Sequence, residues 1–113
     1  MKKDVSRNED IAKYPIYDYR NGVMERIYWI TDTTSYHHFG QELHHFVRKT
    51  MRKNSPDFYK RVEHLQKLIL MSKQMNDDLE TMGEKRFKEV YGVNKDDFVF
   101  SRKKWREGYY DKP

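Results

Sequence analysis

The spacing of apolar residues between positions 36 and 50 constrains the fold of this chain more than any other feature. Residues suited to a buried environment recur there at intervals of three and four, which places them on one side of an α-helix. They are Tyr36, Phe39, Leu43, Phe46, Val47 and Thr50. The preceding segment, Asp-Thr-Thr-Ser at 32–35, consists of residues that cap helices. The pattern predicts a helix over 35–53.

The opposite face of this predicted helix is polar and basic. Spacings of four, three, four and four bring together His37, Gln41, His44, Arg48 and Arg52. Arginine and protonated histidine bind phosphates and carboxylates, so this stripe is the first candidate for a partner-binding surface. With nucleic acid as partner, Lys49 and Lys53 add phosphate contacts, while Gln41 and His44 approach base edges. The alternative is an exposed face with solvated charges.

A β-hairpin is expected before this helix. Residues 14–20 and 23–30 are rich in β-formers, and the Asn21-Gly22 pair between them is a strong hairpin signal. Neighbours in a strand alternate sides, so the aromatic residues here cannot all face a core. We take Tyr17, Tyr19 and Tyr28 as a second candidate surface, suited to a protein partner. The alternative is that a third strand or the C-terminal tail covers these rings and Trp29.

The register of the hairpin depends on the length of its turn. A two-residue turn places Asp18 opposite Glu25, which is an unfavourable pair of like charges. A three-residue loop that includes Val23 pairs Asp18 with Arg26 instead. We therefore prefer the longer loop.

A second, long helix is predicted over 56–82. The segment Asn-Ser-Pro-Asp at 54–57 combines a capping serine, a proline at the first helical position and an acid in the first turn. An apolar stripe follows: Phe58, Val62, Leu65, Leu68, Ile69, Met75, Leu79 and Met82. Such a helix is ~40 Å long at ~1.5 Å per residue. We expect it to pair with the 35–53 helix as an antiparallel hairpin rather than form a coiled coil.

The remaining segments complete an α+β prediction for a single domain over 1–113. Residues 1–12 are polar and expected to be loosely ordered. Gly83 precedes a short helix over 84–91 that ends at Gly92, and 97–101 is a candidate third strand. The tail over 102–113 is basic and aromatic, with Tyr109 and Tyr110 near cationic residues and a tryptophan. Its candidate nucleic-acid contacts are Arg102, Lys103, Lys104, Trp105 and Arg106.

Composition and motifs argue against several classes. The chain has 113 residues, a net charge of +5 and no cysteine, which excludes disulfides and thiolate chemistry. No apolar run reaches membrane-spanning length and the N-terminal segment does not resemble a secretory signal, so we expect a cytoplasmic protein. No serine sits in a nucleophile elbow, so we expect no enzyme.

A metal site is the weakest candidate. His38, Glu42 and His45 would share a helical face, and their side chains are types that bind zinc or iron. The outer two would lie about 10 Å apart along the axis, which suits a single ion poorly. We therefore expect no metal or cofactor, and a His/Glu metal-dependent enzyme is the remaining catalytic alternative.

The combined expectation is a small basic binding protein that acts by occupancy. Its partner would be nucleic acid or a nucleic-acid-handling protein. The alternative is an inhibitor or modulator of a host protein, as small accessory proteins of phages and mobile elements often are, acting in the host cytoplasm.

Overall fold

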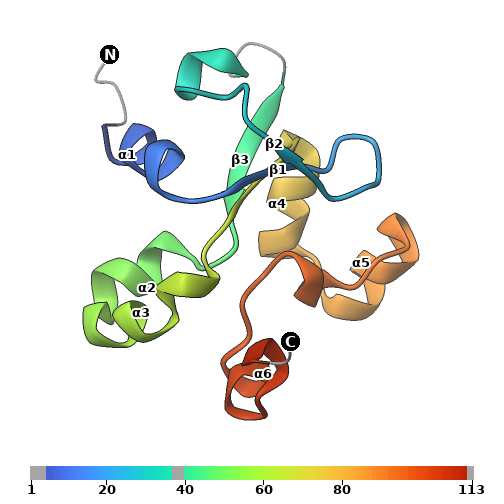
Figure 1. Cartoon of the computed structure of the whole chain (residues 1–113). Coiled ribbons are helices and arrows are strands. Elements are labelled where there is room, and N and C mark those ends of the chain that lie inside the picture. The colour runs from blue at the N-terminus through green and yellow to red at the C-terminus, as the bar shows by residue number, and fades with distance from the viewer. Residues whose placement is uncertain (1–4, 37–39, 112–113) are drawn as a thin grey trace.

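A mixed four-stranded sheet lies at the centre of the computed structural model, which describes residues 5–36 and 40–111 (Figure 1). The strands are β1 (Ile16–Asp18), β2 (Glu25–Ile27), β3 (Gln41–His45) and β4 (Leu68–Ser72). Their order is β2-β1-β4-β3. β1 runs antiparallel to β2 and parallel to β4, and β3 runs antiparallel to β4. The α+β class is therefore confirmed.

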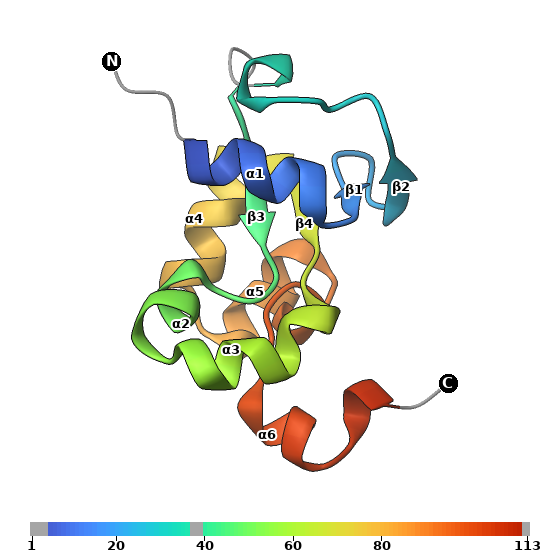
Figure 2. The ribbon, with the colours of Figure 1, turned by 60° about the vertical axis from the view of Figure 1, so that its left-hand side comes forward.

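Helices cover both faces of this sheet. They are α1 (Val5–Lys13), α2 (Lys49–Asn54), α3 (Pro56–Val62), α4 (Lys73–Thr81), α5 (Glu84–Tyr91) and α6 (Arg102–Arg106). Figure 2 shows α1 crossing in front of β3 with α4 on the other side, and α2, α3 and α6 at one end of the molecule. Short 3₁₀ turns occupy 33–35, 63–65, 95–97 and 109–111.

The central strand β4 explains why the sheet needs cover on both faces. Its residues Leu68 to Met71 are buried, as is typical of a strand between two layers. Leu68 and Leu70 pack with α1 through Ile11 and Tyr14. Residues of opposite orientation, led by Ile69 and Met71, pack with α4, α5 and Phe98.

A third apolar cluster joins the end of β3 to α3 and to the C-terminal segment. Its buried members are Phe46, Val47, Tyr59, Val62 and Phe100. Trp105 and Tyr110 pack against it from the tail. The tail is therefore part of the folded structure instead of a segment that is ordered only on contact with a partner.

The predicted helix over 35–53 is wrong, because residues 41–45 form β3. Leu43 pairs with Leu70 and His45 with Leu68, and in such a strand successive side chains, as of His44 and His45, face opposite layers. Helical structure begins only at Lys49. The apolar positions of the predicted stripe that are described do become buried at 36, 43, 46 and 47, but through a strand and its flanking turns.

The predicted helix over 56–82 is wrong as one long helix, because β4 divides it into α3 and α4. Pro56 does begin α3, although the Ser55 side chain makes no capping hydrogen bond. α3 ends at Val62 and β4 follows, after which Ser72 caps α4 by accepting a hydrogen bond from the Met75 backbone nitrogen. An apolar run such as 68–71 fits a buried strand as well as a helix, and pairing with β1 and β3 decided for the strand.

The hairpin is confirmed, but its preferred register is wrong. Asp18 lies opposite Glu25, and Tyr17 lies opposite Arg26. The repulsion is relieved because Arg20 binds the Asp18 carboxylate with both Nε and Nη2, at 2.9 and 2.6 Å. A neighbouring cation therefore permits the register that the strand pair alone disfavours.

Of three remaining expectations, one is confirmed and two are wrong. The helix over 84–91 is confirmed, with Gly83 at its N-cap and Gly92 in the left-handed region at its C-cap. The third strand over 97–101 is wrong, since Phe100 makes a single backbone hydrogen bond, to Phe46, outside the sheet. Residues 5–12 belong to α1, whose Asp10 and Ile11 are buried, so this part of the chain is not loosely held.

Candidate nucleic-acid interface

The basic stripe predicted on a single helix does not exist as one surface. Gln41 and His44 lie in β3, Arg48 precedes α2, and Arg52 lies within α2. His37 lies outside the described residues, as does His38. His44 and Arg48, together with Lys49, line a pocket of about 270 Å³, whereas Arg52 belongs to a separate network. The described members therefore do not form the continuous stripe that a helix would have produced.

Arg52 belongs to a buried network beneath α1. Its Nη1 donates to Oδ1 of Asp10 at 2.8 Å, and its Nη2 donates to Oδ2 at 3.1 Å. Nε2 of His45 lies 2.9 Å from the same Asp10 carboxylate, which is almost fully buried. Burial alone would raise the pKa of Asp10, but hydrogen bonds from Arg52 and His45 outweigh it and lower the pKa. Arg52 is thus a structural cation.

The network continues through two tyrosines to the surface. Tyr14 and Tyr59 share a hydrogen bond of 3.1 Å, and the Tyr14 hydroxyl donates to the Glu63 carboxylate. Lys13 reaches the same carboxylate at 2.7 Å. Burial and the hydrogen bond to Glu63 raise the pKa of Tyr14, so its hydroxyl stays protonated. These contacts fasten α1 to α3.

His44 is buried on the other face of β3. Its Nε2 lies 2.7 Å from the carbonyl oxygen of Phe98, and its Nδ1 lies 2.9 Å from Oδ1 of Asn76. Asn76 Nδ2 in turn donates to the Glu42 carboxylate. Burial lowers the pKa of His44. Because the ring is buried and both of its nitrogens have partners within the fold, it is not placed to contact a base as expected from the sequence.

The remaining basic residues at and within α2 differ in exposure. Arg48 is exposed, with its Nη1 3.7 Å from the Glu80 carboxylate. Lys49 is half-buried at the start of α2, and Lys53 is exposed in its last turn. Only these residues of the predicted stripe and its neighbours remain near the surface as cations.

The metal candidates are separated by the same strand. Glu42 and His45 are three positions apart in β3 and therefore point to opposite faces. Glu42 is bound by Asn76 and His45 by Asp10. Within residues 5–36 and 40–111, no group of three His, Asp or Glu side chains could hold an ion.

The predicted tail forms a different and more organised surface. Ser101 caps α6 by accepting a hydrogen bond from the Lys104 backbone nitrogen. Cζ of Arg102 lies 4.3 Å from the Phe58 ring centroid. Phe58 meets Trp105 edge-to-face at 5.2 Å, and Cζ of Arg61 lies 5.0 Å from the Trp105 ring. Two cations therefore flank a pair of rings where α3 meets α6.

Other cations of α6 differ in their partners. Lys104 binds the Asp96 carboxylate at 2.9 Å and lies 4.7 Å from the Tyr109 ring. Lys103 and Arg106 are exposed. Phe58 and Arg61 were not predicted as site residues, because their contact with the tail links positions more than forty residues apart.

The hairpin presents a second alternation of cation and ring. Cζ of Arg26 lies 4.4 Å from the Tyr28 ring and 5.9 Å from the Tyr17 ring. Its Nη1 donates to the carbonyl oxygens of Ile16 and Ile27, at 3.1 and 2.8 Å. The guanidinium is therefore fixed in place, and Tyr28 remains 78% exposed beside it.

The other aromatic residues of the hairpin divide between the core and the surface. Tyr19 packs edge-to-face on Phe98 at 4.8 Å and so belongs to the core. Trp29 is 48% exposed, and its ring lies 5.5 Å from Cζ of Arg20. The expectation of an aromatic surface holds for Tyr28 and fails for Tyr19.

Lys67 connects the hairpin to the tail. Its Nζ lies 5.7 Å from the Tyr17 ring and 4.8 Å from the Phe46 ring. Phe46 meets Tyr110 at 5.8 Å, and Tyr110 stacks on Phe100 at 5.4 Å. Burial lowers the pKa of Lys67, partly opposed by the charge of Asp97. Lys67 was not singled out in the sequence because it is an isolated lysine beside an apolar run.

These contacts form one continuous series, which we name the cation–aromatic ladder. The ring of Phe100 in turn contacts the ring of Phe58, with 6.2 Å between their centroids. Its members, from the hairpin to α3 and α6, are Tyr28, Arg26, Tyr17, Lys67, Phe46, Tyr110, Phe100, Phe58, Arg102, Trp105 and Arg61. Phe46 and Phe100 are buried supports, while the cations and the remaining rings are at least partly exposed.

Charge is concentrated at the α3 and α6 end of the ladder. Residues 48–66 and 101–111 contain ten basic and four acidic side chains, a net charge of +6. The whole chain carries +5, so all other residues together carry −1. Figure 2 shows α2, α3 and α6 gathered at that end, away from β2. We call this end the basic pole.

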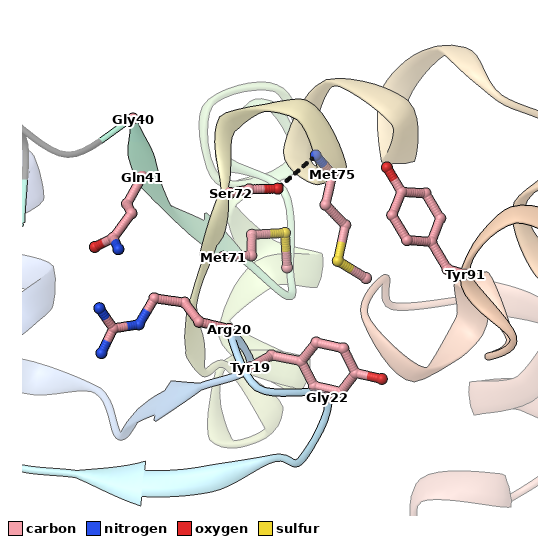
Figure 3. Close-up of a pocket in the computed structure, with 9 residues that line it drawn as sticks. All are labelled: Tyr19, Arg20, Gly22, Gly40, Gln41, Met71, Ser72, Met75 and Tyr91. Atoms are coloured by element: carbon pink, nitrogen blue, oxygen red, sulfur yellow. Dashed lines mark hydrogen bonds between the residues drawn. The ribbon is translucent and has the colours of Figure 1, made fainter.

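A separate cavity of about 470 Å³ opens at the carboxyl ends of β1 and β4 (Figure 3). Met71 and Met75 lie on its inner side, and Tyr91 and Tyr19 flank them. Arg20 and Gln41 border it, but the Arg20 charge is already neutralised by Asp18. Tyr91 donates to the Asp78 carboxylate, and burial raises its pKa to about 12. The cavity thus offers no reactive group.

Comparisons with protein-family models, curated proteins and solved structures gave no significant match. Among the helices in the described ranges, none has the length and apolar character required to cross a membrane. Function is therefore argued from the geometry of this chain alone.

Proposed function

We propose that this protein binds single-stranded nucleic acid along the cation–aromatic ladder and acts by occupancy. The supporting observation is a chain of contacts from Tyr28 to Arg61 in which cations meet ring faces at both ends and rings pack on one another in between. Proteins that hold single strands combine aromatic platforms for the bases with cations that follow the phosphates. Both kinds of side chain are present here in one series.

The availability of the ladder's cations supports this proposal. Across the described residues, neither Arg26, Lys67, Arg61 nor Arg102 forms an ion pair with a carboxylate. Arg61 and Arg102 contact ring faces, Arg26 also donates to backbone carbonyls, and Lys67 contacts ring faces and feels the charge of Asp97. A phosphate could approach the three arginines without breaking an existing salt bridge.

The choice of single strands over duplexes follows from the aromatic members. A ring stacks on a base only where the base is unpaired and its face is open. A duplex reader instead inserts a helix or a β-ribbon into the major groove. α3 and α6 are short, and their rings face each other across a seam. This arrangement suits bases laid against a surface.

Binding of labelled oligonucleotides tests the proposal. Fluorescence anisotropy would compare a twelve-residue single strand, as DNA and as RNA, with its duplex over a salt series. We expect tighter binding of the single strand, with affinity falling steeply as salt rises. Arg61→Gln with Arg102→Gln should reduce the magnitude of the log–log salt slope by about 1.4, since each lost contact to a single strand contributes about 0.7.

A matched control separates the ladder from general basicity. Lys85→Gln with Lys88→Gln also removes two cations, from exposed positions of α5. This pair should leave the slope nearly unchanged. Equal losses for both pairs, or no single-strand binding at about 50 mM salt, would refute the proposal.

A protein partner at the hairpin is the second candidate. Val23, Tyr28 and Trp29 are exposed there, and the segment 14–31 is electrically neutral. Aromatic residues beside arginines dominate many protein interfaces. Trp29→Ala distinguishes the two, because Trp29 lies outside the ladder. Its loss should leave oligonucleotide affinity unchanged, whereas it should weaken capture of a protein that binds the hairpin.

A further inference from the structure

A small cavity adjoins the middle of the ladder. Its volume is about 250 Å³, and it is lined by Phe46, Leu65, Lys67, Asp96, Asp97, Tyr109 and Tyr110. Phe46, Lys67 and Tyr110 are also ladder members. A strand lying along the ladder would therefore pass this opening.

The polar groups of the cavity differ in their existing partners. Asp96 is bound to Lys104 at 2.9 Å. The neighbouring Asp97 carboxylate is exposed, and no hydrogen bond or ion pair joins it to another residue in the described part of the chain. Lys67 Nζ contacts the rings of Tyr17 and Phe46, and the charge of Asp97 acts on it. The cavity thus offers one acceptor group and one donor group.

The walls of the cavity are aromatic. Tyr110 is held by stacking on Phe100, at 5.4 Å and 23° between the ring planes. Tyr109 meets Tyr110 edge-to-face at 5.3 Å and is 51% exposed. Stacking on such rings is favourable for any planar base.

Charge restricts what can enter. A phosphate group would meet two carboxylates and is disfavoured, while a small cation would meet Lys67. A neutral planar group with both donors and acceptors fits the walls and the polar groups together. A nucleobase has these properties.

We infer that this cavity binds a guanine base of the single strand held by the ladder, an inference that rests on the proposed function. A carboxylate has two oxygens that only accept hydrogen bonds. The Watson–Crick edge of guanine offers two adjacent donors, N1–H and the 2-amino group, and beside them the O6 acceptor for Lys67. Uracil and thymine place carbonyls on both sides of their single N–H, which would face the carboxylate.

Adenine and cytosine match less well for the same reason. Each presents one amino group next to an unprotonated ring nitrogen, which would lie against the second carboxylate oxygen. A matched bidentate contact to a base typically favours the correct base by about tenfold or more. Guanine should therefore bind more tightly than the other bases at this position.

Oligothymidylate with one central substitution tests the inference. The central residue would be guanine, hypoxanthine, adenine or thymine, and each strand would be made as DNA and as RNA with uridine. We expect the guanine strand to bind about tenfold more tightly than the unsubstituted strand. Hypoxanthine lacks the 2-amino group and should lose most of this gain.

Variants assign the preference to the cavity. Asp97→Asn should abolish the guanine preference while leaving the salt slope close to that of the wild type. Asp77→Asn, an exposed carboxylate on α4, should keep the preference and serves as the control. Equal affinity for the guanine and unsubstituted strands, with salt-dependent binding intact, would overturn the guanine site and leave the proposed function standing.

A second measurement keeps the cavity testable if oligonucleotides do not bind. Guanosine, which has no phosphate, would be titrated into ¹⁵N-labelled protein while amide chemical shifts are recorded. Shifts at Lys67, Asp97 and Tyr109, absent with uridine and in Asp97→Asn, would support the site even without strand binding. Absence of such shifts together with absence of strand binding would overturn both the site and the proposed function.

Discussion

Arg52 and Arg102 lie against neighbouring residues of the same helix, yet their environments are opposite. Arg52 lies 5.7 Å from the ring of Tyr59, which is buried, and it binds the Asp10 carboxylate with two nitrogens. Arg102 lies 4.3 Å from the ring of Phe58, which is half-buried, and within the described ranges it has no carboxylate partner. Arg52 therefore holds α1 against α2 and α3, while Arg102 is available to a ligand.

The difference shows what makes an arginine structural in this protein. Ring contact is common to both residues, so it does not distinguish them. A buried carboxylate does, because Asp10 must be compensated by cations once it is removed from water. The sequence shows both arginines as part of basic clusters, and only the fold shows which cluster contains the carboxylate.

Removal of each arginine should therefore give opposite phenotypes. Arg52→Met leaves Asp10 with His45 alone and should lower the free energy of unfolding by about 2 to 4 kcal/mol. Arg102→Met should change it by less than about 0.5 kcal/mol and should weaken oligonucleotide binding instead. Urea denaturation and anisotropy on the same two variants measure both effects. Similar losses of stability in both variants would contradict the comparison.

Acid titration should separate the buried groups by pH window. Burial lowers the pKa of His44, so the folded protein releases a proton that the unfolded chain retains below about pH 6.5. Stability from this source is present above that pH and is lost as pH falls toward the folded pKa. The pKa of Asp10 is also lowered, so its contribution is lost only below about pH 4.

His44→Gln tests the first of these windows. The variant should be less stable than the wild type at pH 7, since it loses the ring contacts with Phe98 and Asn76. The difference in free energy of unfolding between wild type and variant should narrow between pH 7 and pH 5, because only the wild type loses stability through protonation of His44. A constant difference over this range would show that His44 does not titrate as its burial predicts.

The smallest effect is expected from the exposed cations of α6. Arg106→Gln should leave the free energy of unfolding within about 0.5 kcal/mol of the wild type, as is usual for surface positions. If Arg106 contacts phosphate, the salt slope should fall in magnitude by about 0.7. An unchanged slope would confine the nucleic-acid contact to the ladder itself.

The outcome at His44 and His45 explains why the site could not be predicted from the stripe. The helical spacing of Leu43, Phe46 and Val47 predicts that both histidines lie on a helix. All three apolar residues are indeed buried. The strand pairing with β4 instead sends His44 toward Asn76 and His45 toward Asp10. The tail residues Arg102 and Trp105 do lie among cations and rings, but their partners Phe58 and Arg61 come from a distant segment.

Turn and capping residues in the sequence determined the ends of several helices and strands. The hairpin around Asn21-Gly22, the start of α3 at Pro56 and the end of α5 at Gly92 are of this kind. The sequence alone also established the concentration of charge and aromatic residues in the tail. Only the tertiary structure decided that 41–45 and 68–72 are strands, because a short apolar run satisfies either periodicity until a neighbouring strand supplies its backbone hydrogen bonds. Tertiary structure also decided the composition of the ladder. Burial of Asp10 takes Arg52 as its partner, and the contact of α3 with α6 brings other cations against rings.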